Sequence, residues 1–280
     1  MEFLRLGEPG RERPAVRENG ATHDLTPLTD DLDGAFLAAD GVARTRAALG
    51  AGSLPRLDPS GLRVGAPIAR PTAVLCVGQN YAAHAAESGS APPTEPVLFM
   101  KHPNTVVGPY DDLPKPPGAT RLDWEVELGV VIGRRAWQLG SDAEALAHIA
   151  GFVVTHDVSE RRWQLEESGG QWSKGKSAPG FTPVGPVLVP ADEVPDVQAL
   201  GLWSRVNGEP RQSSNTVDMI FSVAHIVRHL SRYVALEPGD LVITGTPEGV
   251  ALSGRFPYLE PGDVVELGID GLGVQRQVVA

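Results

Sequence analysis

Acidic and apolar residues alternate strictly over the seven positions from Leu122 to Leu128, which read Leu-Asp-Trp-Glu-Val-Glu-Leu. Side chains two positions apart share one face of a β-strand, so the period predicts a strand with a buried apolar face and with Asp123, Glu125 and Glu127 projecting together, roughly 7 Å apart per pair. Oxygen ligands on a rigid backbone suit a hard divalent ion such as Mg²⁺ or Mn²⁺, and such an ion would relieve the repulsion between neighbouring carboxylates. A half-exposed strand face would carry the same pattern.

A further acid ends the apolar run 152–155, which is typical of a buried strand. Because functional residues often follow the ends of strands, Asp157 is predicted to complete a three-carboxylate cage with Glu125 and Glu127, leaving positions for water and a chelating substrate. The alternative role of Asp157 is that of a turn or capping residue before the next helix. We interpret His156 as a packed neighbour rather than a ligand.

His84 and Glu87 are three residues apart in a stretch that predicts a helix, so their side chains share one face. A carboxylate that accepts a hydrogen bond from one imidazole nitrogen fixes the tautomer, and the other nitrogen then becomes a base able to activate water near neutral pH. Exposed helices also carry such pairs without a catalytic role, and the spacing alone is compatible with both interpretations.

The composition narrows the function classes. The chain has 280 residues, of which 41% are hydrophobic and 21% charged, as expected for one large globular domain with or without a small appendage. The formal net charge of −11 argues against binding to nucleic acid or to an anionic membrane surface. A single cysteine, Cys76, excludes an intrachain disulfide and a zinc site built from several thiolates. With no apolar leader or spanning segment, we expect a cytoplasmic protein.

The elements that must position these residues are mostly strands. Residues 1–70 predict a small N-terminal αβ subdomain: a strand over 1–7, a hairpin turning at Asn19-Gly20, and one amphipathic helix over 29–49. Residues 71–280 predict a β-rich domain, with a strand over 73–77 that leads into a helix at Tyr81, and a long helix from Asn215 onward. The predicted fold class is mixed α/β and β-rich, a roll or barrel-like domain with the N-terminal appendage.

The order of the motifs resembles the fumarylacetoacetate hydrolase family over essentially the whole chain. The segments that carry the resemblance are VLCVGQNYAAHAAE, PVLFMK, LDWEVELGVVIG, GFVVTHDVSERRWQ, QWSKGKSAPGFTPVGPVLV, VNGEPRQSSNTVDMIF, LEPGDLVITGTPEGV and LEPGDVVEL. The N-terminal FLRLGEPGRERPAV resembles the same region of bacterial members that act on acylpyruvates, diketo sugar acids and related 2-oxo acids. The resemblance implies the β-roll fold of that family, a homodimer, and a Mg²⁺ or Mn²⁺ ion held by Glu125, Glu127 and Asp157.

The resemblance also implies roles for residues around the cage. His84 and Glu87 match the water-activating pair, which lies on a segment that often orders into a lid over the substrate. Lys176 matches a lysine that contacts substrate oxygens. Alternatively, it could be a solvent-exposed lysine in a loop without a role in catalysis. Four further positions match substrate-binding residues: Gln79, Tyr81, Gln164 and Thr246. Gln164 could instead be a surface residue of a helix, and Thr246 a threonine at the end of a strand.

Three positions depart from the pattern of many family members, and they bear on substrate identity rather than on the metal. Gln79 stands where some acylpyruvate-cleaving members have a basic residue, His156 where many have Asn, and Pro179 where many have Asp.

The reaction implied is hydrolysis of a C–C bond. A 2-oxo acid chelates a hard ion through its carboxylate and keto oxygens, so the implied substrate is an acylpyruvate or related 2,4-diketo acid, cleaved through a metal-stabilised pyruvate enolate. Oxaloacetate decarboxylation and isomerisation of a 2-hydroxyhepta-2,4-diene-1,7-dioate pass through the same enolate without a hydrolytic water. A non-catalytic metal- or ligand-binding member is a third possibility. A non-haem iron oxygenase would require two histidines and one carboxylate, which the cage does not offer.

Overall fold

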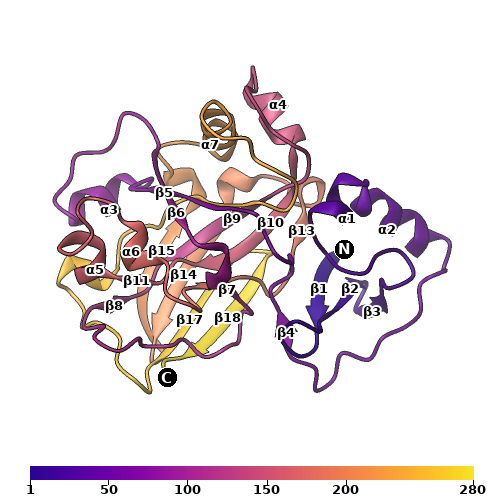
Figure 1. Cartoon of the computed structure of the whole chain (residues 1–280), viewed down its shortest axis with the longest axis horizontal. Coiled ribbons are helices and arrows are strands. Elements are labelled where there is room, and N and C mark those ends of the chain that lie inside the picture. The colour runs from indigo at the N-terminus through magenta and orange to yellow at the C-terminus, as the bar shows by residue number, and fades with distance from the viewer.

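The first 65 residues form a four-stranded antiparallel sheet, in the order β3-β2-β1-β4, with two helices beside it (Figure 1). The computed structural model describes all residues 1–280. The elements of this unit are β1 (Glu2–Leu6), β2 (Arg13–Glu18), β3 (Ala21–Asp24), β4 (Val64–Gly65), α1 (Gly34–Ala38) and α2 (Gly41–Gly50). The predicted hairpin is confirmed, because Asn19 and Gly20 take φ angles of 51° and 76° between β2 and β3.

The single helix predicted over 29–49 is wrong. Asp40 takes a left-handed φ of 52°, which a residue inside a right-handed helix cannot have, and the chain therefore divides into α1 and α2. Gly41 lies against the ring and backbone of Phe36, so the second helix begins where α1 leaves room only for a glycine.

A six-stranded sheet forms the centre of the molecule, in the order β13-β10-β9-β16-β5-β6. Its strands are β5 (Val74–Gly78), β6 (Val97–Lys101), β9 (Val126–Ile132), β10 (Ile149–His156), β13 (Val189–Pro190) and β16 (Leu241–Ile243). All neighbours are antiparallel except the parallel pair β5 and β16. Both faces of this sheet are covered, which explains why β5, β9, β10 and β16 have nearly continuous apolar sequences.

A second four-stranded sheet, in the order β15-β14-β17-β18, packs on one face of the central sheet. It consists of β14 (Gly201–Val206), β15 (Glu209–Asn215), β17 (Val264–Ile269) and β18 (Gly273–Val278). Val130 and Phe152 of the central sheet share one apolar core with Leu202 and Leu267 of this sheet. The opposite face carries Val131 and the N-terminal unit.

Helices cover the remaining edges. In Figure 1, α3 (Ala82–Glu87), α5 (Arg161–Leu165) and α6 (Ser173–Lys176) gather at the left end, while α4 (Asp142–Ala147) and α7 (Val223–Leu230) lie side by side at the top. Short strand pairs complete the fold: β7 (Val106–Val107) with β12 (Thr182–Pro183), and β8 (Leu122–Asp123) with β11 (Ser159–Glu160). The helix predicted from Asn215 begins only at Val223, because Asn215 caps a separate 3₁₀ turn and Ser222 caps α7.

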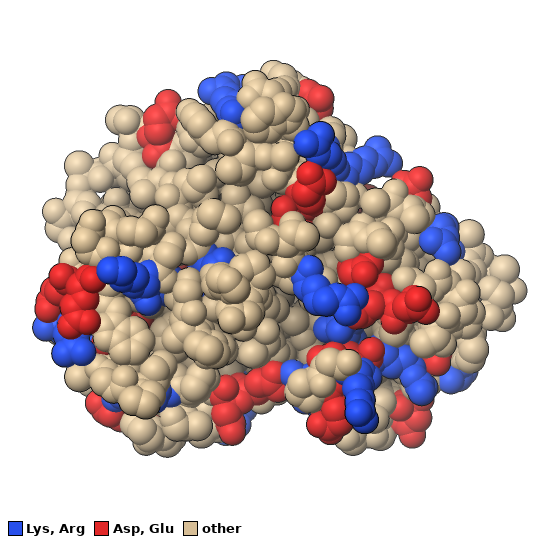
Figure 2. Space-filling view, viewed as in Figure 1, with Lys and Arg blue, Asp and Glu red and all other residues tan.

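Charged residues of both signs are interspersed on the face shown in Figure 2, with red and blue side chains adjoining over the N-terminal unit. This face carries no continuous basic tract of the kind that binds a phosphate backbone. None of the helices combines the length and the apolar character that crossing a membrane requires.

One apolar core joins the N-terminal unit to the central sheet. Phe3 of β1 is fully buried and belongs to the same cluster as Phe36 of α1, Val131 of β9 and Ile243 of β16. The division of the chain at residue 70 stays a prediction, and this shared core shows that the two parts are physically coupled.

We expect the Phe3→Ala variant to lose about 3–5 kcal/mol of unfolding free energy, because removing the phenyl ring leaves a cavity in the apolar core that the two parts share. Urea unfolding followed by tryptophan fluorescence and far-UV circular dichroism should give one shifted, coincident transition. Leu62→Ala, on the same unit but exposed, should change stability by less than about 0.5 kcal/mol. Two separate transitions, with only the first shifted, would show that the N-terminal unit folds on its own.

Candidate active site

The pairing of β9 with β10 brings the predicted acids together. Thr155 lies opposite Glu127 and His156 opposite Val126, and the same register continues as the Asp157 amide donates to the Glu125 carbonyl at 3.0 Å. Since residues two apart share a face, Glu125, Glu127 and Asp157 all project from the same side of the sheet. One oxygen from each carboxylate lies within 4.8 Å of the others, and all three residues are buried.

Asp123 does not join this cluster, contrary to the prediction that it projects with the other two acids. The strand is interrupted after Asp123, which lies in β8, and its carboxylate accepts hydrogen bonds from Arg161 at 2.7 Å and from the amides of Ala251 and Leu252 at 2.8 and 2.9 Å. Asp123 is therefore an anchor for the chain beside the cluster. The half-exposed strand face offered as an alternative is also wrong, because every residue from 122 to 132 is buried.

Three buried basic side chains surround the acids. Lys176 Nζ lies 2.6 Å from Glu125 and 2.8 Å from Asp157, so it joins two of the three carboxylates. Lys101 Nζ contacts the other oxygen of Asp157 at 2.5 Å, and Arg161 reaches Glu125 at 2.7 Å. Sequence reasoning missed Lys101 and Arg161, although each stands in a motif that carries the resemblance. For Lys101, the signal that could have indicated a functional role is its position as a basic residue at the end of the apolar strand β6.

The electrostatics of the cluster are uneven. Burial alone would raise the pKa of Glu125, but Lys176 and Arg161 outweigh it and hold that pKa well below its usual range. Burial, together with Asp157 and Glu125, raises the pKa of Glu127 well above its usual value. Glu127 accepts a hydrogen bond from the Gly245 amide but has no cationic partner. Glu127 is therefore the acid of the cluster whose ionised form no directly contacting cation stabilises.

His84 and Glu87 form the predicted pair on α3. His84 Nδ1 lies 3.1 Å from Glu87 Oε1, and both side chains are largely buried. The Glu87 carboxylate also accepts hydrogen bonds from the Gly249 amide at 3.0 and 3.1 Å, so its position is fixed from two directions. Glu87 thereby orients the imidazole of His84.

Two glycines allow the loop TGTPEGV, which follows β16, to adopt its conformation. Gly245 has a φ of +99°, and a Cβ atom there would lie 2.7 Å from Cβ of Asn80. Gly249 has a φ of +104°, and a Cβ atom there would lie 2.2 Å from the carbonyl oxygen of Arg211. Both backbones need a residue without a side chain in order to present their amides to Glu127 and Glu87.

A cavity of about 260 Å³ is lined by the pair on α3 and by two of the three clustered acids, whereas Asp157 is fully buried and does not line it. Of the predicted substrate-binding residues, Gln79, Gln164 and Thr246 line it. So do the following predicted catalytic and metal-binding residues: His84, Glu87, Lys176, Glu125 and Glu127. Tyr81 is buried outside the lining, and its hydroxyl group has no hydrogen-bond partner. Which of these residues contact a substrate stays a prediction.

A larger hollow, of about 600 Å³, lies between α2, α4 and the segment 191–197 and contains none of the predicted residues. His156 is fully buried, contacts Gln277 at 3.0 Å, and has its pKa lowered to about 4 by burial. His156 packs beside the cluster, and Pro179 is exposed and does not line the cavity.

Residues 73–280 match the family model of the fumarylacetoacetate hydrolase C-terminal domain. The chain belongs to the fumarylacetoacetate hydrolase family. A hydrolase candidate from Burkholderia multivorans, whose name specifies no substrate, is 46% identical over 282 residues, covering 99% of this chain and 98% of its own length. Membership confirms the resemblance and the β-rich mixed α/β fold.

Solved structures of the family superpose closely. The fumarylacetoacetate hydrolase of Exiguobacterium antarcticum is 37% identical with a TM-score of 0.85, covering 100% of this chain and 99% of its own. The 2-hydroxyhepta-2,4-diene-1,7-dioate isomerase of Mycobacterium marinum is 30% identical with a TM-score of 0.77, covering 100% and 98%. The maleylpyruvate hydrolase of Sphingobium sp. SYK-6, solved with manganese(II) and pyruvate, shares the fold at 24% identity, a TM-score of 0.81 and coverage of 100% and 99%.

Arg161→Gln is expected to destabilise the protein by about 3–5 kcal/mol in a metal-free buffer, because the buried Asp123 and Glu125 lose their shared cation. Urea unfolding measures the change. Arg121→Gln, which removes an exposed pair with Glu166, should cost at most about 1 kcal/mol. Equal stability of the two variants would mean that Arg161 is not needed to compensate the buried acids.

Proposed function

We propose that this member of the fumarylacetoacetate hydrolase family is a Mg²⁺- or Mn²⁺-dependent hydrolase that cleaves a C–C bond of an acylpyruvate or related 2,4-diketo acid. The observation that carries the proposal is that one cavity is lined by a carboxylate-oriented histidine and by two acids, Glu125 and Glu127, of a three-carboxylate cluster. The first offers ligands for a hard ion, and the second offers a base for water.

The donor set fits a hard divalent ion. Three carboxylates offer only oxygen ligands, and Glu127 has no cation of its own. When bound, the ion would orient a chelating 2-oxo acid and act as a Lewis acid on its keto oxygen. Glu125, Glu127 and Asp157 are the residues that would hold it.

Charge balance supports an anionic substrate. Once Glu127 is ionised, as a metal ligand must be, Asp123 and the three carboxylates of the cluster face three buried cations, which leaves one negative charge before the ion itself is counted. A divalent ion changes the sum to one positive charge. A carboxylate-bearing 2-oxo acid would neutralise it, whereas a neutral or cationic substrate would not.

The catalytic step assigned to the chain itself is water activation. His84, oriented by Glu87, removes a proton from water, and the oxygen adds to the distal carbonyl of the 2,4-diketo acid. The C–C bond then breaks, its electron pair passes to the pyruvate fragment as an enolate, and a proton returns to that carbon. Lys176 and Arg161, which line the cavity and both contact Glu125, supply positive charge there. The products are pyruvate and a carboxylic acid.

Isomerisation is the second candidate, because the M. marinum isomerase superposes over the whole chain. That reaction and oxaloacetate decarboxylation need no hydrolytic water, so they depend less on the pair of His84 and Glu87. The assembly of a homodimer stays a prediction, and so do the cytoplasmic location and the absence of nucleic-acid and membrane partners.

Glu127→Gln should abolish metal binding and metal-dependent turnover while the fold is retained. The change removes one ligand charge, and no buried cation is left unpaired because Glu127 has none. We expect the affinity for Mn²⁺, measured by calorimetry, to fall by at least about 100-fold, since even indirect contacts to a metal contribute 10–100-fold. Glu166→Gln, at an exposed acid, is the matched control. Unchanged affinity for Mn²⁺ in the Glu127→Gln variant would place the ion elsewhere.

His84→Ala should slow release of pyruvate from a simple acylpyruvate by about 10²–10⁴-fold, with the affinity for Mn²⁺ unchanged, because only the base is lost. His148→Ala, on α4's C-terminal side, is the control. Both variants should also be assayed with oxaloacetate and with an unsaturated dioate. The proposed hydrolase activity is contradicted if the wild-type protein turns over only one of these two substrates and if His84→Ala does not change the rate. The protein would then be a decarboxylase or an isomerase, according to the substrate consumed.

A further inference from the structure

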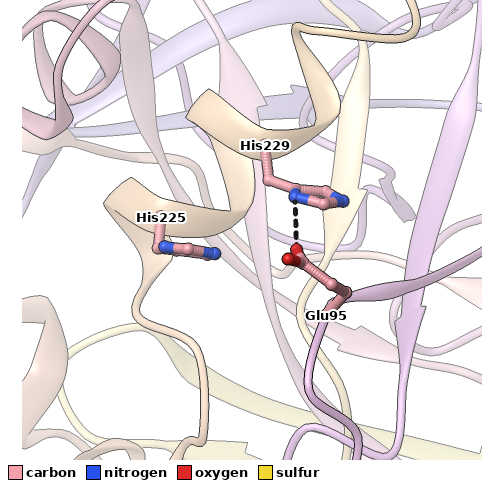
Figure 3. A group of neighbouring side chains, drawn as sticks. All are labelled: Glu95, His225 and His229. Atoms are coloured by element: carbon pink, nitrogen blue, oxygen red, sulfur yellow. Dashed lines mark ion pairs between the residues drawn. The ribbon is translucent and has the colours of Figure 1, made fainter.

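A second cluster of potential ligands lies at the surface beside α7. Figure 3 shows His225 and His229 projecting from the same side of α7, with Glu95 approaching from the segment that precedes β6. One ligand atom from each residue lies within 4.8 Å of the others. His229 Nδ1 is 3.3 Å from Glu95 Oε2, and the two imidazole rings are nearly parallel, 6.0 Å apart and inclined by 17°.

The rings are held in place before any ion binds. The ring of Phe221 stacks on His225 at 5.4 Å, and that of Tyr233 packs against His229 at 5.2 Å. The Nε2 atom of His225 is buried and has no hydrogen-bond partner. A buried polar atom without a partner is rare in a folded protein and calls for an explanation, which a bound ion would provide. Fixed side chains of this kind are what a metal site requires.

The donors select a different class of ion from that of the carboxylate cluster. Imidazole nitrogens favour Zn²⁺, Cu²⁺ and Ni²⁺, whereas Mg²⁺ prefers oxygen ligands alone. Two histidines four apart on a helix share one face and can bind the same ion. Coordination through His225 Nε2 needs the ring proton on Nδ1, so Arg228 would give up its contact of 3.4 Å there and keep its ion pair with Asp142 at 2.8 Å.

We propose that Glu95, His225 and His229 form a second metal site, which binds a borderline divalent ion such as Zn²⁺ and fastens the segment carrying His84 and Glu87 to α7. The inference does not depend on the proposed reaction. It rests on the ligand geometry and on where Glu95 stands in the chain.

The segment from Asn80 to Glu95 is attached to the start of α7 at only one end by several hydrogen bonds. Asn80 donates to the Phe221 carbonyl at 3.1 Å and accepts from the Phe221 amide at 2.8 Å, and the Ile220 amide donates to the Asn80 carbonyl at 2.7 Å. At the other end, Glu95 contacts α7 through its ion pair with His229. The Glu95 side chain is 72% exposed, so this pair alone holds the segment weakly. A shared ion would make this second attachment firm.

Zinc binding tests the site directly. Protein in excess Mg²⁺ is titrated with Zn²⁺ against a chromophoric chelator, for wild type and for Glu127→Gln, in which the carboxylate cluster is impaired. We expect one Zn²⁺ per chain in both, and an affinity at least about 100-fold weaker when His225→Ala and His229→Ala are combined in either background. Glu95→Gln should weaken binding without disturbing the core, since it is exposed. His148→Ala should bind as wild type does.

Zinc binding that disappears with Glu127→Gln, or that is the same in the wild type and the double histidine variant, would overturn the second site. If the double variant fails to fold, Glu95→Gln decides alone: unchanged affinity refutes the site. Hydrogen exchange tests the attachment. Zn²⁺ should slow exchange of the amides of residues 88–91, 94 and 95 in wild type and in His148→Ala, but not in Glu95→Gln. Zinc binding without slower exchange would refute the fastening of the segment.

Discussion

The fold must offset the electrostatic repulsion between three buried carboxylates, which have oxygen atoms within 4.8 Å of one another. At an effective dielectric constant of about 20, each pair of unit charges 4 Å apart repels by about 4 kcal/mol, and a typical domain has only about 5–15 kcal/mol of net stability. Such a cluster cannot stay ionised and folded without cations. The chain supplies Lys101, Lys176 and Arg161, all of them buried, and each is brought in by a different element: the end of β6, α6 and α5. The arrangement of these short elements around β9 and β10 follows from that requirement.

The same requirement separates what could be predicted from what could not. Strand period and the strand end before Asp157 predict that Glu125, Glu127 and Asp157 act together, whereas the antiparallel register that places Asp157 beside Glu125 is known only from the structure. The fate of Asp123 could not be predicted in this way, since it depends on a break in the strand and on amides of residues 251 and 252, which are distant in sequence. Burial of Arg161 could not be predicted either, because the sequence does not say which charges leave water, and for Lys101 the one indication was its place at the end of an apolar strand.

Local signals gave the boundaries where the backbone alone decides them, and failed where tertiary contacts decide. The turn at Asn19-Gly20 needs only positive φ angles, so it was predicted. The start of α7 was predicted several residues too early, because the apolar period continues through residues whose backbone is already bonded to Asn80. The predicted helix over 29–49 failed for a similar reason: its apolar period does not reveal the left-handed Asp40.

The loop after β16 joins the two halves of the candidate site. The amide of Gly245 reaches Glu127 in the carboxylate cluster, the hydroxyl of Thr246 donates to the carbonyl of Val126 at 2.9 Å, and the amide of Gly249 holds Glu87. The distance between the ligand cluster and the histidine is thus set by five consecutive residues rather than by the packing of α3 alone. Because α3 has only six residues, the side chains of His84 and Glu87 owe their position to this loop on one side and to Asn80 on the other. Rigid backbone on both sides is what a water-activating pair needs, since a displacement of about 1 Å can cost 10²-fold in rate.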